Sequence, residues 1–243
     1  MKKGLVTGAG GGIGTAVVKR MLAESVDVLA VDRDEGALMR LKDTGAETLN
    51  VDLTDPAERA ELVRVCGNLD YLVNAAGVIA MIPIERVIPL DWEKILKVNA
   101  EATFFLCQAF AATLRPNGAI VNISSIAAKT GATAETAVYA ASKAAVLSIT
   151  RSFANALAPR GIRVNAVCPG LIDTQMNDKV VVDLSARDSM EAEEWRAKRV
   201  TSVPLGREAD PSECASAIWY LLSDDSSYIT GQSLNVSGGL VNW

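Results

Sequence analysis

Short apolar runs alternate with amphipathic stretches along the whole chain. Residues 12–25, between the first two runs, carry apolar side chains at helical spacing, and longer helical stretches separate most of the later runs. Strands that are apolar on both faces and joined by helices form a parallel sheet covered on both sides. The pattern predicts a doubly wound α/β fold with about seven strands, in residues 4–10, 26–32, 46–52, 69–77, 118–125, 161–170 and 232–239.

The length of 243 residues and the hydrophobic fraction of 49% fit a single globular domain, residues 1–243. No Pro/Gly/Ser-rich linker or repeat divides the chain. The least regular segment, residues 173–208, is rich in charge and follows a predicted strand. Because ligands of such folds bind beyond the carboxyl ends of the strands, we expect this segment to be a substrate lid or specificity loop.

Composition argues against several kinds of function. A net charge of −5 disfavours nucleic-acid and anionic-membrane partners, and the apolar runs are too short to span a bilayer. Because glycines interrupt the N-terminus before a signal-peptide core can form, we expect a cytoplasmic protein. The chain has no histidine, and its four cysteines are scattered singly, so neither a Ser-His-Asp triad nor a bound metal is expected.

The first predicted strand runs straight into the sequence TGAGGGIG. Gly8, Gly12 and Gly14 would let the backbone turn sharply and approach a pyrophosphate at a helix N-terminus. The spacing departs from G-x-G-x-x-G, so a plain tight turn is the alternative. Asp32 ends the second strand about 20 residues later, where an acid can bind the adenosine ribose and repel a 2′-phosphate. This favours NAD over NADP, although Arg33 could pair with such a phosphate and Asp32 could simply cap a helix.

Tyr139 and Lys143 stand four positions apart in a predicted helix and therefore point the same way. A free tyrosine has a pKa of about 10 and is a poor base at neutral pH. A neighbouring ammonium and the positive ring of an oxidised nicotinamide both favour the phenolate. The pair could therefore accept a proton, and a solvated helix face is the alternative interpretation.

Six short motifs occur in the order found in the short-chain dehydrogenase/reductase family, and the resemblance runs over essentially the whole chain. They are TGAGGGIG (Thr7–Gly14), NAAG (Asn74–Gly77), Asn99 in KVNAEATF, Ser125 in NISS, YAASK (Tyr139–Lys143) and CPGLIDT, which ends at Thr174. The resemblance implies a Rossmann fold, a nicotinamide dinucleotide cofactor and a homotetramer.

The resemblance also implies roles for four residues. Tyr139 would be the general base in alcohol oxidation and the general acid in ketone reduction. Lys143 would lower the pKa of Tyr139 and hold the nicotinamide ribose. Ser125, with Ser124 as the second candidate, would orient the substrate oxygen, and Asn99 would anchor a water molecule in a proton path from Lys143. A strand-ending serine and a satisfied buried amide are the plainer interpretations of Ser125 and Asn99.

Contacts to the cofactor follow from the same resemblance. Asp52 and Leu53 would bind the adenine, although Asp52 could instead cap the following helix. Ile172 and Thr174 would hold the nicotinamide carboxamide. The full predicted cofactor set is Gly8, Gly12, Ile13, Gly14, Asp32, Asp52, Leu53, Asn74, Ala75, Gly77, Tyr139, Lys143, Pro169, Gly170, Ile172 and Thr174.

The predicted reaction is hydride transfer between NAD(H) and a secondary alcohol or its ketone, with a small hydroxy acid, sugar acid or polyol as substrate. A 3-oxoacyl thioester reductase, which would generally use NADPH, is the second hypothesis, and a dinucleotide sensor without catalysis is the third. Lys129, Arg196 and Arg199 could pair with a substrate carboxylate or be solvated surface. Trp243 could fill a neighbouring subunit's pocket or dock on its own surface. The helical stretches 91–114 and 137–158 could pack across a dimer interface or within the core.

Overall fold

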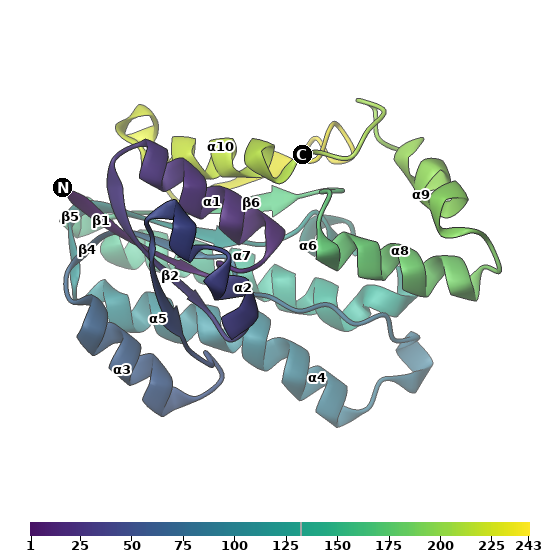
Figure 1. Cartoon of the computed structure of the whole chain (residues 1–243), viewed down its shortest axis with the longest axis horizontal. Helices are drawn as coiled ribbons and strands as arrows, with labels where there is room; N and C mark the ends of the chain where they lie inside the picture. The colour runs from purple at the N-terminus through teal and green to yellow at the C-terminus, as the bar shows by residue number, and fades with distance from the viewer. Residues whose placement is uncertain (132) are drawn as a thin grey trace.

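The computed structural model describes residues 1–131 and 133–243. Its centre is a seven-stranded parallel sheet with the strand order β3-β2-β1-β4-β5-β6-β7 (Figure 1). This arrangement confirms the predicted doubly wound α/β fold. The strands are β1 Lys2–Thr7, β2 Val26–Asp32, β3 Glu47–Asn50, β4 Leu69–Asn74, β5 Leu114–Ile123, β6 Arg163–Pro169 and β7 Ser233–Val236.

Helices cover both faces of the sheet, because successive strand residues point to opposite faces. On β1, Val6 packs with the layer formed by α1, α2 and α10, whereas Leu5 packs with the layer formed by α3, α5 and α7. In Figure 1, α1 and α10 lie above the sheet and α3 and α5 below it. These helices are α1 Gly12–Ala23, α2 Glu35–Met39, α3 Pro56–Cys66, α5 Ala102–Ala111, α7 Ala137–Leu157 and α10 Pro211–Leu222.

The strand order reverses beside β1. This strand pairs with β2 on one side and with β4 on the other, so the chain leaves the outer strand β3 and crosses back over β1 before it forms β4. The connections that follow β1 and β4 therefore diverge to opposite faces and leave a crevice at their carboxyl ends. In open α/β sheets this crevice is where ligands bind.

Residues 173–208 are not irregular, contrary to the sequence-based expectation. They form two helices, α8 Gln175–Arg187 and α9 Ala192–Val200, beyond the carboxyl ends of the strands (Figure 1). Thr174 caps α8 by accepting a hydrogen bond from the Asn177 amide at 3.3 Å. Val181 and Leu184 bury one face of α8, whereas every residue of α9 is exposed or half-buried. We call α8 and α9 the lid helices.

The predicted helix 91–114 is interrupted. α4 Pro89–Leu96 and α5 are joined by a π-helical turn, Lys97–Glu101, which contains the fully buried Asn99. Such a turn inserts one extra residue per turn and is frequent at functional sites. Within the described part of the chain, no helix is long and apolar enough to cross a membrane.

Candidate active site

One cavity of about 860 Å³ lies at the crevice beside β1 and β4. Its nucleotide end is lined by Asp32, the last residue of β2, by Arg33, which follows it, and by Asp52, which comes after β3. Its lid end is lined by side chains of α8 and α9, including Trp195 and Arg199. The glycine-rich turn and the start of α7 line the space between the two ends. All the predicted cofactor residues except Asn74 line this cavity.

The glycine-rich turn between β1 and α1 fits a pyrophosphate. Gly8 has a φ of +63°, and a Cβ there would lie 2.6 Å from the backbone of Ala76. A Cβ on Gly14 would lie 2.1 Å from the Gly8 carbonyl oxygen. Gly11 is the N-cap of α1 and offers no side chain to its first-turn amides, and that turn holds no acid. These amides therefore remain available to bind an anion that enters the cavity.

Asp32 ties the nucleotide end together. Its carboxylate accepts hydrogen bonds from the amide of Gly10 at 2.9 Å and from the amide of Asp34 at 3.0 Å. The helix-cap alternative is wrong for Asp32, because Asp34 caps α2 by accepting from the Ala37 amide at 3.0 Å. Each Asp32 oxygen keeps a lone pair that a ribose hydroxyl could use.

Asp52 is not a helix cap either. Asp55 caps α3, and the Asp52 carboxylate instead accepts a hydrogen bond from the amide of Thr54 at 2.8 Å. Hydrogen bonding to Thr54 is the main cause of the lowered pKa of Asp52, with Arg33 adding to it. Asp52 and its neighbour Leu53 both line the cavity, so an acceptor and an apolar surface lie together where the adenine was predicted.

Asn74 lies below the cavity rather than on its wall. It is the last residue of β4, and its Nδ2 donates to the Oδ1 of Asn122 at 2.8 Å. Asn122 in turn donates to the hydroxyl of Thr150 on α7 at 3.0 Å. The motif asparagine thus joins β4, β5 and α7, and the neighbouring Ala75 and Gly77 line the cavity in its place.

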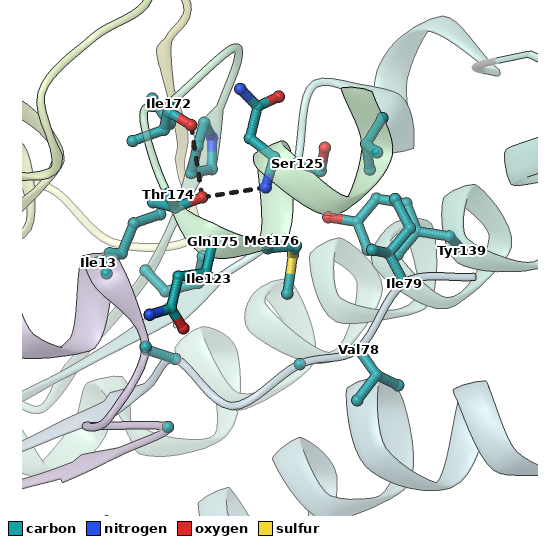
Figure 2. Close-up of a pocket in the computed structure, with 18 of the residues that line it drawn as sticks. Ile13, Val78, Ile79, Ile123, Ser125, Tyr139, Ile172, Thr174, Gln175 and Met176 are labelled. Atoms are coloured by element: carbon teal, nitrogen blue, oxygen red, sulfur yellow. Dashed lines mark hydrogen bonds between the residues drawn. The ribbon is translucent and has the colours of Figure 1, made fainter. Parts of the chain in front are cut away.

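Tyr139 and Lys143 both line the cavity from α7, as their spacing predicts. The Lys143 Nζ lies 5.9 Å from the centre of the Tyr139 ring and donates to the carbonyl oxygen of Ile123 at 2.9 Å. The Tyr139 hydroxyl points into the pocket beside Ser125 (Figure 2). Ser124 instead donates its hydroxyl proton to the carbonyl of Lys143 at 2.8 Å and so ties α7 to the end of β5. This geometry favours Ser125 over Ser124 as the serine that meets a substrate.

Burial sets the pKa values of the pair. Burial raises the pKa of the Tyr139 phenol above its ordinary value of 10.0, and hydrogen bonding by Ser125 opposes this shift. Burial also lowers the pKa of Lys143 from 10.5 to about 8. The amine therefore loses its proton before the phenol does. Ser125 is the protein group that lowers the pKa of Tyr139, and Lys143 does not lower it, in contrast to the sequence-based expectation.

Asn99 holds two backbone segments in place. Its Oδ1 accepts from the Val78 amide at 2.8 Å, and its Nδ2 donates to the Val78 carbonyl and to the Ser142 hydroxyl, both at 2.9 Å. Both Nδ2 protons are therefore used, and Asn99 is not part of the cavity wall. A Cβ on Gly77 would lie 3.4 Å from the Asn99 Oδ1 and 3.2 Å from the Lys143 Nζ, so the wall fits closely here.

The connection after β6 closes the cavity from above. Pro169, Gly170 and Ile172 line it, and the Thr174 hydroxyl donates to the Ile172 carbonyl at 3.4 Å (Figure 2). A Cβ on Gly12 would lie 2.6 Å from the methyl group of Thr174, so this connection touches the glycine-rich turn. Ile13 and Thr174 both line the cavity and lie near each other in Figure 2.

The three basic residues considered for a substrate carboxylate lie in different places. Lys129 is not part of the cavity wall and donates to the carbonyls of Ser233 at 3.3 Å and Trp243 at 3.1 Å. Arg196 lies outside the wall too, in ion pairs described below, whereas Arg199 lines the cavity. The side chain of Trp243 is exposed. No cluster of metal-ligating side chains occurs in residues 1–131 and 133–243.

Sequence reasoning missed further wall residues on the lid helices and before α7. Trp195 and Arg187 of the lid helices and Glu135 line the cavity. Arg187 and Glu135 form an ion pair between α8 and the turn that precedes α7. The helical spacing of the apolar residues in α8 could have revealed that helix, but no local signal distinguishes these polar side chains from solvated ones.

Comparison with known proteins identifies the family. The chain belongs to the short-chain dehydrogenase/reductase family, and a family model described as enoyl-(acyl carrier protein) reductase matches residues 8–241. Members of this family are oxidoreductases that act on alcohol and ketone groups with nicotinamide dinucleotide cofactors.

Three relatives illustrate the similarity. The chain is 36% identical to the 3-oxoacyl-(acyl-carrier-protein) reductase of Thermotoga maritima, over 98% of this chain and 96% of that protein. It is 34% identical to the (S)-acetoin-forming diacetyl reductase of Staphylococcus epidermidis, over 99% and 98%. The structure of an actinorhodin polyketide ketoreductase variant with NADPH matches with a TM-score of 0.92 and 32% identity, over 100% of this chain and 98% of that one.

Proposed function

We propose that the protein is an NAD-dependent dehydrogenase of a small hydroxy acid, sugar acid or polyol. The observation that carries the proposal is the single cavity in which Asp32, the glycine-rich turn, Ser125, Tyr139 and Lys143 all take part. A dinucleotide laid along it from Asp32 would bring its nicotinamide to the phenol. A dinucleotide sensor without catalysis would have no use for this proton-transfer group.

Tyr139 is the proton acceptor in alcohol oxidation and the donor in ketone reduction. The hydroxyl of Ser125 hydrogen-bonds the substrate oxygen and aligns it with the phenol. A nicotinamide held in this cavity would supply the hydride chemistry, and its positive oxidised ring would offset the burial that raises the pKa of Tyr139. Lys143 binds the nicotinamide ribose and exchanges protons with the phenol.

Asn99 is a positioning residue in this proposal. It fixes Val78, which lines the cavity, against Ser142 on the helix that carries Tyr139 and Lys143. The side-chain amide of Asn99 uses both of its donors on the protein, so it does not donate a hydrogen bond to a water molecule in a proton path from Lys143.

Preference for NAD rests on the Asp32 carboxylate, which would face a 2′-phosphate with like charge. A reductase of 3-oxoacyl thioesters that uses NADPH is the second candidate. It is favoured by the relative from Thermotoga maritima and by Arg33 and Arg40, which line the nucleotide end and could bind a phosphate.

We also propose a cytoplasmic homotetramer. Apolar side chains of Ile88, Leu90, Trp92, Phe104 and Phe105 are exposed on and beside α4 and α5, which supports association through these helices. Light scattering of the purified protein in solution tests the tetramer.

A substrate panel tests the proposed reaction. Hydroxy acids, sugar acids, polyols and 3-oxoacyl thioesters are each assayed with NAD(H) and NADP(H) by the absorbance of the reduced cofactor. We expect turnover of a hydroxy acid, sugar acid or polyol, with a higher kcat/KM for NAD than for NADP. Activity confined to acyl thioesters with NADPH would establish the second candidate instead.

A further inference from the structure

Three arginines belong to the lid helices, and two of them are neutralised within the protein. Arg187 forms an ion pair with Glu135. Arg196 forms ion pairs with Asp178 and with Glu208, the latter at 2.6 Å. The Arg196 pairs join α9 to α8 and to the segment after α9, and the Arg187 pair joins α8 to the turn before α7. The side chains of Arg187 and Arg196 therefore have a structural role.

Among the residues that the structure describes, Arg199 has no such carboxylate partner. Its Nη1 donates to the Oδ1 of Asn177 at 2.6 Å, and its guanidinium carbon lies 5.5 Å from the centre of the Trp195 ring. Among the described residues, no carboxylate oxygen lies within 4.0 Å of its nitrogen atoms. The acid whose charge raises the pKa of Arg199 is Glu208. This carboxylate already accepts hydrogen bonds from Asn177 at 2.9 Å and from Arg196.

Arg199 also differs from Arg196 in position, because it lines the cavity. It lines the cavity together with Asn177 and Trp195, at the lid end and across from the nucleotide end. Two other charged side chains that line this end, Glu135 and Arg187, pair with each other. The lid end therefore carries excess positive charge, which favours an anionic group on whatever enters it.

We propose that Arg199 binds the carboxylate of the substrate and makes the enzyme select an oxo or hydroxy acid over a neutral alcohol of the same skeleton. The inference rests on the proposed dehydrogenase function and narrows its substrate class. Trp195 supports the guanidinium, Asn177 occupies one of its N–H groups, and the remaining N–H groups form the fork that a carboxylate accepts. A half-buried guanidinium without a counter-ion costs desolvation energy that a bound carboxylate offsets.

Binding of butanoate and butanamide tests the site without turnover. The two compounds have the same shape and differ in charge, and each is titrated by calorimetry into protein saturated with NAD. We expect butanoate to bind at least about tenfold more tightly than butanamide. Arg199→Leu should weaken butanoate binding about 10- to 100-fold and leave butanamide within about twofold.

The matched control is Lys198→Met. Lys198 is the preceding residue of α9, is exposed and does not line the cavity, so its loss removes the same charge from the same helix. We expect it to leave the affinity for both compounds unchanged. Three results would overturn the inference. The wild type could bind butanoate and butanamide equally, or both variants could lose the same affinity for butanoate. The third is that the wild type binds inorganic phosphate more tightly than butanoate.

Turnover separates this inference from the proposed function. Wild-type protein and Arg199→Leu are compared for oxidation of 3-hydroxybutanoate and butane-1,3-diol, which share the reacting carbon. We expect the wild type to favour the acid in kcat/KM and Arg199→Leu to lose that preference, because its kcat/KM falls far more for the acid than for the diol. If the ratio of kcat/KM for the acid to kcat/KM for the diol is the same in the variant as in the wild type, the dehydrogenase function stands and the carboxylate site is wrong. If butanoate binding depends on Arg199 but neither alcohol reacts, the carboxylate site stands and the proposed reaction fails for these substrates.

The variant's affinity for NAD is the remaining check. Arg199 is assigned to substrate, so the dissociation constant of NAD should change less than about threefold in Arg199→Leu. A larger loss would assign Arg199 to a cofactor phosphate and overturn the inference.

Discussion

The nucleotide end and the lid end of the cavity are built from different materials. At the nucleotide end, the polar groups are backbone amides of the glycine-rich turn and carboxylates near the strand ends. The amides of Gly10 and Asp34, for example, donate hydrogen bonds to the Asp32 carboxylate. At the lid end, the wall consists of long side chains from the lid helices, held by ion pairs such as Arg196 with Glu208.

This difference separates two tasks. Backbone groups bind the pyrophosphate and ribose that every dinucleotide shares. Their geometry changes little when a side chain is replaced. A wall of side chains reads what one particular substrate carries, and a single substitution can alter it. The phenol of Tyr139 and the amine of Lys143 lie between the two ends, so they are expected to serve any substrate that the lid end admits.

Removing the phenol oxygen should have the largest effect. Tyr139→Phe keeps the ring and deletes the proton donor and acceptor, so we expect kcat to fall about 10²- to 10⁴-fold. Cofactor affinity, which depends on the nucleotide end, should stay within a few fold when measured by fluorescence of NADH. Tyr220→Phe, on the exposed side of α10, is the control and should retain full activity. Near-normal turnover of Tyr139→Phe would show that another group carries the proton.

The two ends also differ in how well the sequence predicts them. The glycine-rich turn, Asp32 and the pair Tyr139 and Lys143 are local patterns, because each places its chemistry within one turn or one helix face. The fold followed from the same kind of local evidence, since the strands are continuous apolar runs.

The lid end depends on distances that no spacing encodes. Arg196 and Arg199 are three residues apart on α9, yet one pairs with Glu208 and the other lines the cavity. Asp32 and Asp34 show the same limit, because the sequence left helix capping open as an alternative for Asp32, whereas the structure shows that Asp34 caps α2. In both cases the outcome was decided by partners from other segments, which only the folded chain brings together.

Neutralising Asp32 tests whether the nucleotide end sets the preference for NAD over NADP. Asp32→Asn keeps an oxygen that can accept the Gly10 amide but removes the charge that would repel a 2′-phosphate. We expect the ratio of NADP to NAD affinity to rise by about tenfold, measured with the two reduced cofactors by fluorescence. Glu35→Gln, an exposed change in the first turn of α2, is the control and should leave the ratio unchanged. A wild-type protein that already binds NADP more tightly would contradict the premise.

The smallest expected effect concerns the amine between the two ends. Burial lowers the pKa of Lys143 from 10.5 to about 8, so between these values the unfolded chain binds a proton that the folded protein does not. The free energy of unfolding of the wild type should therefore rise with pH in this window, relative to Lys143→Met, by about 1 kcal/mol per pH unit. Below the window both states hold the proton, so the difference between the two proteins should be constant.

Urea unfolding of both proteins at a series of pH values from about 6 to 10 measures this difference. Burial raises the pKa of the thiols Cys66, Cys107 and Cys214, which destabilises the folded state as pH rises, but both proteins contain them and the contribution cancels in the difference. Lys179→Met, an exposed change on α8, should show no such rise. A difference that stays flat for Lys143→Met as well would mean that the amine keeps its charge in the folded protein. In that case the ammonium would be present when Tyr139 ionises, and it would favour the phenolate directly.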